Sequence, residues 1–334
     1  MAQPMPLVAV KKPDLRLAAL RRFALAITVL TVIGHLVLGF ETSYAHPIVA
    51  VLTAYFLELG LDVLDARLNC RPIAFLGGGL PRVVDFLLPA HITALACAML
   101  LYPGETFAPL VFAVTIGVCT KHIFRAPLGN GKTSHFLNPS NTGILAALIA
   151  FRWVNIAPPY QFTENVSGAW DWAIPGIVVI TGSLLNSRLT GKTPLILGWL
   201  GGFAAQAVLR SLFFDFGVFQ ALSPMTGMAF VLFTFYMVTD PGTTPFKPRN
   251  QLIFGLSVAA VYGFLDVIHV VYQLFVALFV VCCSRGLLLH VSTIYASRRE
   301  ALARLPLPHA GQPPVVAPHV IGEQSGAVPV SMLK

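Results

Sequence analysis

The chain has 334 residues, of which 56% are hydrophobic and only 11% are charged. Soluble globular domains carry about 25% charged residues, so the composition excludes an ordinary water-soluble domain and indicates a lipid bilayer as the surrounding solvent. The net charge of +8 does not predict a nucleic-acid partner, because the basic residues alternate between connections along the chain instead of gathering in one segment.

Ten apolar runs follow one another along the chain, and a membrane-spanning helix needs about 20 mostly apolar residues. Several runs are shorter, so broken or re-entrant helices are an open alternative to full crossings. The sequence predicts an all-α, polytopic integral membrane protein with about ten transmembrane helices. The runs cover residues 23–40, 47–65, 84–102, 107–124, 142–157, 172–186, 194–213, 226–239, 252–268 and 270–292.

Lys and Arg occur in every second connection between these runs, whereas the intervening connections carry acidic charges only. Cytoplasmic loops of membrane proteins are enriched in Lys and Arg, so the pattern predicts that both termini are cytoplasmic. The basic residues are Lys11, Lys12, Arg16, Arg21, Arg22, Arg67, Arg71, Arg82, Lys121, Arg125, Lys132, Arg188, Lys192, Lys247, Arg249, Arg298, Arg299 and Arg304, and the acidic ones in the intervening connections are Glu41, Glu105, Glu164, Asp171 and Asp215.

The expected organisation has three parts. Residues 1–22 form a basic cytoplasmic arm, and residues 23–292 form the transmembrane domain. Residues 293–334 are rich in Pro and lack hydrophobic periodicity, so they are expected to be a disordered cytoplasmic tail. The five cysteines include no CxxC pair. Four of them lie in or beside apolar runs, where a free Cys acts as a small apolar group, so no metal site is predicted.

Small polar residues gather where an apolar run begins, in the segment NPSNTG at 138–143. Asn and Ser cap helix starts, Pro fixes φ, and free backbone N–H groups at such a start favour an anionic ligand. The alternative is an ordinary helix cap. The nearby Gly131-Lys132-Thr133 is not a phosphate loop, because Ala126 stands where that motif needs its first Gly.

A second polar segment, TDPGTTP at 239–245, interrupts two apolar runs. Asp240 can orient the loop, Gly242 permits an unusual φ, and Thr243 and Thr244 offer hydroxyl groups. Both polar segments are predicted to face the cytoplasm, so we expect them to line one ligand site together. Under the alternative, the second segment also does no more than cap a helix.

The two motifs resemble those of the RnfD/NqrB family. They are NPSNTG before an apolar run and, later, FYMVTDPGTTPFKPRNQLIFG at 235–255. Members of this family are integral subunits of bacterial flavin-dependent electron-transfer complexes that couple redox chemistry to Na⁺ or H⁺ movement. The resemblance covers residues 107–292. The chain length and basic arm are most similar to a shorter branch encoded with enediyne-type biosynthetic genes. The resemblance implies the inner membrane of a bacterial cell.

Covalent FMN is not expected. Family members that carry it attach FMN by a phosphoester to the Thr of an S-G-x-T motif in an outward-facing loop. The corresponding segment here is SGAW at 167–170, so Trp170 stands where the Thr would be and supplies no hydroxyl. Ser167 is the alternative acceptor, with a different geometry.

The resemblance instead implies a non-covalent flavin, riboflavin or FMN, within the membrane domain. The expected function is an integral membrane redox subunit that passes electrons, with other membrane or redox subunits as partners. The runner-up is a redox-free channel or carrier on the same scaffold, and the third candidate is a membrane scaffold for biosynthetic enzymes. The residues expected to contact the flavin are Asn138, Ser140, Asn141, Asp240, Thr243 and Thr244.

Ionisable side chains inside the predicted helices are functional candidates, because charge within a bilayer is costly. Glu58 and His91 are expected to lie deepest and are candidates for an ion or proton pathway. The alternative for both is a hydrogen-bonded structural role. Asp62 and Asp65 lie nearer the cytoplasmic end, where arginines of the next connection are expected to pair with them.

Overall fold

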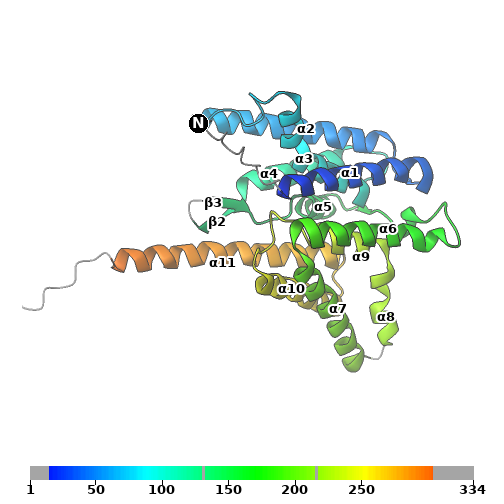
Figure 1. The fold of residues 1–334 in the computed structure, drawn as a ribbon. Coiled ribbons are helices and arrows are strands. Elements are labelled where there is room, and N and C mark those ends of the chain that lie inside the picture. Colours follow the sequence, from blue (N-terminus) through cyan, green and yellow to red (C-terminus); the bar gives the residue numbers. More distant parts are fainter. Residues whose placement is uncertain (1–14, 130–131, 215–216, 304–334) are drawn as a thin grey trace, which may run out of the picture. The chain divides into compact units, whose positions relative to one another are not determined.

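The computed structural model describes residues 15–129, 132–214 and 217–303 (Figure 1). Within these residues, seven helices are long and apolar enough to cross a membrane, or eight if one bent pair counts as a span. The predicted all-α, multi-pass architecture is therefore confirmed. The long helices are α1 (Leu15–Ile33, continued by a π-helical segment, Gly34–Leu38), α2 (Ala45–Leu68), α3 (Gly79–Leu100), α6 (Trp170–Leu185, continued by Asn186–Thr190), α7 (Thr193–Phe213), α10 (Pro248–Val267) and α11 (Gln273–Ala303).

The remaining helices are short or broken. They are α4 (Ala108–Ile123), α5 (Pro139–Ala150), α8 (Val218–Leu222, followed by a 3-10 turn, Ser223–Thr226) and α9 (Met228–Leu232, continued by a π-helical segment, Phe233–Met237). At 1.5 Å per residue, α5 is about 18 Å long, against about 30 Å for the hydrocarbon core of a bilayer. The α8 and α9 segments meet at a bend of 66°. Each predicted apolar run thus contains a helix, but not each helix is a full crossing.

The predicted bounds of the helix at 142–157 are wrong at both ends. It begins earlier, at Pro139, because Asn138 caps it, and it ends at Ala150. Beyond that end, β4 (Asn155–Ile156) pairs antiparallel with β1 (Leu101–Tyr102), which draws the chain out of the helical path. Arg152 therefore lies in an exposed connection and not inside a helix. This residue is an exception to the alternation of basic connections, and the cytoplasmic location of the termini stays a prediction.

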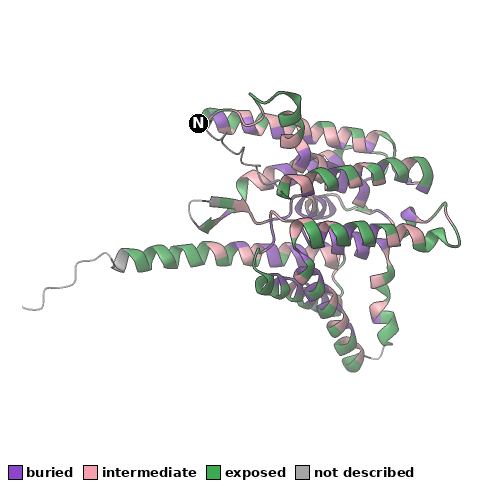
Figure 2. Ribbon diagram, in the orientation of Figure 1, coloured by how far each residue is buried: buried purple, intermediate pink, exposed green. Residues whose placement is uncertain are grey.

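Glycines allow two pairs of helices to pack backbone against backbone. A Cβ on Gly143 of α5 would overlap the carbonyl oxygen of Ala113 in α4. A Cβ on Gly255 of α10 would likewise overlap the carbonyl oxygen of Leu195 in α7. Small residues permit such close approach in membrane helices. Figure 2 shows exposed residues along α1, α2 and α6, and they include large apolar side chains such as Phe56, which suits contact with lipid.

A short hairpin leads into α5 and so positions the first polar motif. It consists of β2 (Arg125–Gly129) and β3 (Lys132–His135), paired antiparallel. The chain divides into two compact units, of which the first ends at Thr293, and the end of α11 from Ile294 belongs to the second. Most of the predicted basic arm (1–14), most of the predicted tail (304–334) and Asp215 lie outside the described residues.

Candidate functional site

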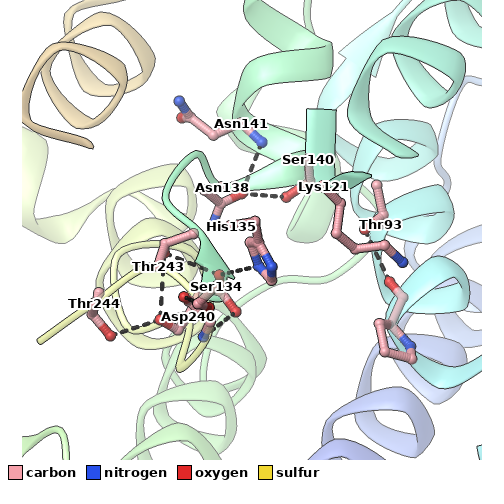
Figure 3. A network of polar contacts seen from close by, with 12 residues as sticks. Thr93, Lys121, Ser134, His135, Asn138, Ser140, Asn141, Asp240, Thr243 and Thr244 are labelled. Carbon is pink, nitrogen blue, oxygen red and sulfur yellow. Dashed lines mark hydrogen bonds and ion pairs between the residues drawn. The ribbon is translucent and has the colours of Figure 1, made fainter. Parts of the chain in front are cut away.

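The two polar motifs lie side by side although about a hundred residues of chain separate them (Figure 3). Asn138 Nδ2 donates to the carbonyl oxygen of Met237 at 3.0 Å, and Ser134 Oγ donates to the carbonyl oxygen of Gly242 at 2.9 Å. His135 Nε2 lies 3.8 Å from a carboxylate oxygen of Asp240. Residues 134–141 and 237–246 are called here the two-loop network.

Asn138 organises the start of α5. Its Oδ1 accepts from the backbone N–H of Asn141 at 3.0 Å and from Ser140 Oγ at 3.0 Å. Thr142 Oγ1 donates back to the carbonyl oxygen of Asn138 at 2.8 Å, and Pro139 occupies the first helical position. These are the contacts of a helix cap. Asn138 and Ser140 therefore have a defined structural role, whether or not a ligand is also bound.

Asp240 organises the second loop. Thr243 Oγ1 donates to its carboxylate at 3.0 Å, and Thr244 Oγ1 donates to its carbonyl oxygen at 2.6 Å. Both threonines are buried. Gly242 does not adopt the unusual φ expected from the sequence. It is needed for space, because a Cβ there would overlap the ring of His135.

Two cations that the sequence reasoning did not assign to the site contact this loop. Lys192, whose side chain is 2% exposed, donates from Nζ to the carbonyl oxygen of Pro245 at 2.8 Å and lies 5.5 Å from the ring centroid of Phe246. Arg285 Nη1 donates to the carbonyl oxygen of Thr243 at 2.8 Å. The rule that an ionisable residue inside a membrane helix is a functional candidate identifies Arg285, which lies within the run 270–292.

The electrostatics of the network favour a bound anion. Burial lowers the pKa of Lys192 to about 8, Asp240 opposes this change, and Arg285 adds to it. Burial alone would raise the pKa of Asp240, but His135, Thr243 and the backbone N–H of Gly242 outweigh burial and hold that pKa below its usual value. Around neutral pH the lysine and the arginine are both charged, so the positive charges of the cluster outnumber its single carboxylate.

A cavity adjoins the network. Asn141 Nδ2 donates to the carbonyl oxygen of Phe275 at 3.0 Å, and Asn141 Oδ1 is buried without a partner among the described residues. Phe275 and Met237 also line a mostly apolar cavity of about 200 Å³. Gln161, 2% exposed, lines it as well and uses its Nε2 to bind the carbonyl oxygen of Met99. The cavity therefore offers apolar walls with a few polar groups, as small-molecule sites do.

The structure places Glu58 in an ion pair between α2 and α4. Lys121 Nζ lies 2.5 Å from a carboxylate oxygen of Glu58, and His122 Nε2 lies 3.5 Å from the same oxygen. Arg71 pairs with both Asp62 and Asp65, as expected for arginines of that connection.

His91 makes a separate set of contacts, with α1 and α2. Thr28 Oγ1 gives its single proton to the carbonyl oxygen of Ala24, so it accepts from His91 Nε2 at 2.8 Å. In the neutral imidazole, Nδ1 then accepts from Tyr55 Oη at 2.9 Å. The two pathway candidates thus belong to different clusters, one centred on Glu58 and one on His91.

Ser167 and Trp170 are both exposed, and Trp170 is the first residue of α6. No protein-family model matches the chain, and no curated protein matches it significantly. The resemblance to the RnfD/NqrB family therefore rests on the two motifs.

Proposed function

We propose that the chain is an integral membrane redox subunit that holds a non-covalent flavin, riboflavin or FMN, beside the two-loop network. One observation carries the proposal. The two segments that resemble the RnfD/NqrB family are in direct contact through Asn138, Ser134 and Asp240, and a cavity lined by Met237 and Phe275 adjoins them.

The residues present match the chemistry of such a ligand, although the cavity, at about 200 Å³, is smaller than the range of about 300–1,000 Å³ that is typical of small-molecule sites, so flavin binding requires it to widen. An isoalloxazine ring needs apolar walls and a few fixed hydrogen bonds. Asn141 lies behind the cavity wall, where its Nδ2 binds the carbonyl oxygen of Phe275 and its Oδ1 is buried without a partner among the described residues. Lys192 and Arg285 supply positive charge, and the start of α5 adds the positive end of a helix dipole. A bound flavin would supply one- and two-electron transfer. Lys192 and Arg285 do not line the cavity, so in the proposal their charge meets the polar end of the ligand and not its ring.

The site resembles the expected one in its residues but differs in their roles. Thr243 and Thr244 donate inside their own turn, so they hold the loop in place for a ligand and are not its main contacts. In the proposal, Lys192 and Arg285 contact the polar end of the ligand, and Asn141 supports the cavity wall through the carbonyl oxygen of Phe275. Glu58 and His91 remain proposed members of an ion pathway coupled to electron transfer, with other redox subunits as partners.

The test is direct measurement of flavin in the purified full-length protein. We expect absorbance near 450 nm, a general property of flavins, and release of riboflavin or FMN on denaturation, identified by mass spectrometry. Arg285→Gln should lower flavin content at least tenfold, whereas the exposed Arg249→Gln serves as a matched control and should leave it unchanged. Colourless wild-type protein with no released flavin would defeat the proposal.

A second candidate, a solute carrier without redox chemistry, is favoured by the bend of 66° between the α8 and α9 segments. Transporters build their binding sites where membrane helices are discontinuous. Solute uptake into proteoliposomes that contain no flavin would favour this candidate over the redox subunit.

A further inference from the structure

A second hollow, of about 330 Å³, lies between the end of α7, the α8 segment and the end of α10. It is separate from the two-loop network, because Lys192 precedes α7 whereas the hollow lies at the other end of that helix. Five polar side chains line it: Arg210, Gln220, Tyr262, Asp266 and His269. Its volume lies within the range of about 300–1,000 Å³ that is typical of small-molecule sites.

The hollow contains an ion pair between two membrane helices. Arg210 of α7 pairs with Asp266 of α10, and their side chains are 12% and 28% exposed. Arg210 Nε also donates to Gln206 Oε1 at 2.7 Å, and Asp266 Oδ1 accepts from Gln273 Nε2 at 3.1 Å. Both residues lie in the last turns of their helices, and charges of membrane helices that face a cavity mark binding sites or ion pathways. The flanking amides hold both charged groups at the wall of the hollow.

Two further features point to a ligand. Tyr262 is 6% exposed, yet its hydroxyl forms no hydrogen bond with any residue that the structure describes, and the side chain lines the hollow. The hydroxyl oxygen keeps accessible surface, so it is open to a ligand in the hollow. His269 has φ of 55°, in the left-handed region that non-glycine residues rarely occupy. Such strain gathers at functional sites.

We infer that this hollow binds a small zwitterion, an α-amino acid with an apolar side chain or a zwitterionic lipid headgroup. The carboxylate or phosphate of the ligand would contact Arg210, and its ammonium group would contact Asp266. One ion pair is then replaced by two, and every charge keeps a partner. A ligand with a single charge makes only one of these two contacts. Tyr262 and Gln220 supply hydrogen bonds to the same ligand.

Apolar residues close the remaining wall, and they include Phe214, Pro224 and Val267. They suit an aromatic or aliphatic side chain better than a polar one, because apolar surface buried against them leaves water. L-Phenylalanine is therefore the first probe. A short-chain phosphatidylethanolamine is the second, and it carries the same pair of charges on a lipid.

The experiment is calorimetric titration of the purified full-length protein in an uncharged sugar detergent. We expect L-phenylalanine to bind at least tenfold more tightly than phenethylamine, which lacks the carboxylate, and 3-phenylpropionate, which lacks the ammonium group. Tighter binding of the short-chain phosphatidylethanolamine also supports the zwitterion site and identifies a lipid as its source. Equal binding of the singly charged analogues, or no binding of either zwitterion, overturns the inference.

Two variants separate binding from folding. Tyr262→Phe removes the unpartnered hydroxyl and keeps the ring, so affinity should fall about five- to tenfold while the melting temperature stays at the wild-type value. The exposed Tyr160→Phe is the matched control and should change neither. Asp266→Asn should reverse the preference, so that 3-phenylpropionate binds more tightly than L-phenylalanine. Unchanged selectivity in Asp266→Asn, with the protein folded, contradicts the assignment.

Discussion

Lys192 is a charged residue with almost no exposed surface, and its amine makes the two-loop network sensitive to pH. Its pKa is about 8 in the folded protein and 10.5 when unperturbed. Between these values the unfolded chain binds more protons than the folded chain, so stability rises with pH across this window. Below about pH 8 both states are charged, and Lys192 contributes no slope.

We therefore expect the wild-type protein to gain stability relative to Lys192→Met as the pH rises from about 8 to 10.5. At 1.36 kcal/mol per pKa unit, the gain is up to about 3 kcal/mol. The measurement is the difference in melting temperature between the two proteins at each pH, which cancels the titration of all other groups. A difference that is constant across this window would show that Lys192 titrates normally.

Trp170 carries a prediction about covalent modification. A phosphoester needs a hydroxyl group, and the indole of Trp170 supplies none, so the intact mass after denaturation should equal that of the unmodified chain. An added mass equal to one FMN would contradict this, and peptide mapping would show whether Ser167 is the acceptor. Trp170→Thr should gain the added mass only in a host that supplies a flavin transferase.

At the scale of single residues, the sequence identified several residues of the two-loop network but not their partners. Asn138, Asp240 and the two threonines stand out because small polar residues at helix starts are recognisable. The position of Arg285 inside an apolar run marks it as a candidate, but the sequence does not show that Arg285 and Lys192 bind the carbonyl oxygens of Thr243 and Pro245. Every residue has such a carbonyl, so these contacts have no sequence signature.

Helices α2 and α4 are joined by the buried ion pair between Glu58 and Lys121. Removing one partner of a buried pair leaves an uncompensated charge, which typically costs 3–5 kcal/mol. Lys121→Met should therefore lower the free energy of unfolding by about 3 kcal/mol. The double variant Glu58→Gln with Lys121→Met should recover more than half of that loss, because no charge is left unpaired.

The measurement is a double-mutant cycle from denaturation in detergent, with both single variants included. Equal stability of the wild-type protein and Lys121→Met would show that the pair is solvated and weak. In that case Glu58 becomes a stronger candidate for an exchangeable proton.

At the scale of elements, apolar runs located the helices but not their ends. The run 142–157 stays apolar past Ala150, and only the pairing of β4 with β1, a contact between segments far apart in sequence, ends the helix. The bend at 226–239 was open from the sequence because the run is short. Its angle depends on how the α8 and α9 segments pack, which periodicity does not encode.

At the scale of the whole molecule, the predicted orientation can be tested with the cysteines of the chain. Cys70 is exposed, whereas the other four are buried or partly buried. If the basic connections are cytoplasmic, an impermeant maleimide should label Cys70 only after cells are permeabilised. In a Cys70→Ser background, Ser167→Cys should react in intact cells, and Thr133→Cys only after permeabilisation.

The reverse labelling pattern would contradict the predicted orientation of residues 70–167 and would move the two-loop network to the external face. Thr244, which lies in one of the connections under test, is unsuitable as a reporter because it is buried in its own turn. Ser167 and Thr133 are both exposed, so a Cys at either position reports the side of the membrane on which it lies without disturbing the fold.

The close packing of α7 on α10 has a mechanical consequence. Because Gly255 brings the backbones of these helices into contact, we expect α7 and α10 to move together as one unit. Lys192 lies at one end of this helix pair, and the Arg210–Asp266 ion pair lies at the other. Any opening or closing of the hollow beside that pair must then come from movement of the α8 segment and of the bend that follows it. Amide hydrogens of residues 218–227 should exchange with solvent much faster than those of α7 and α10.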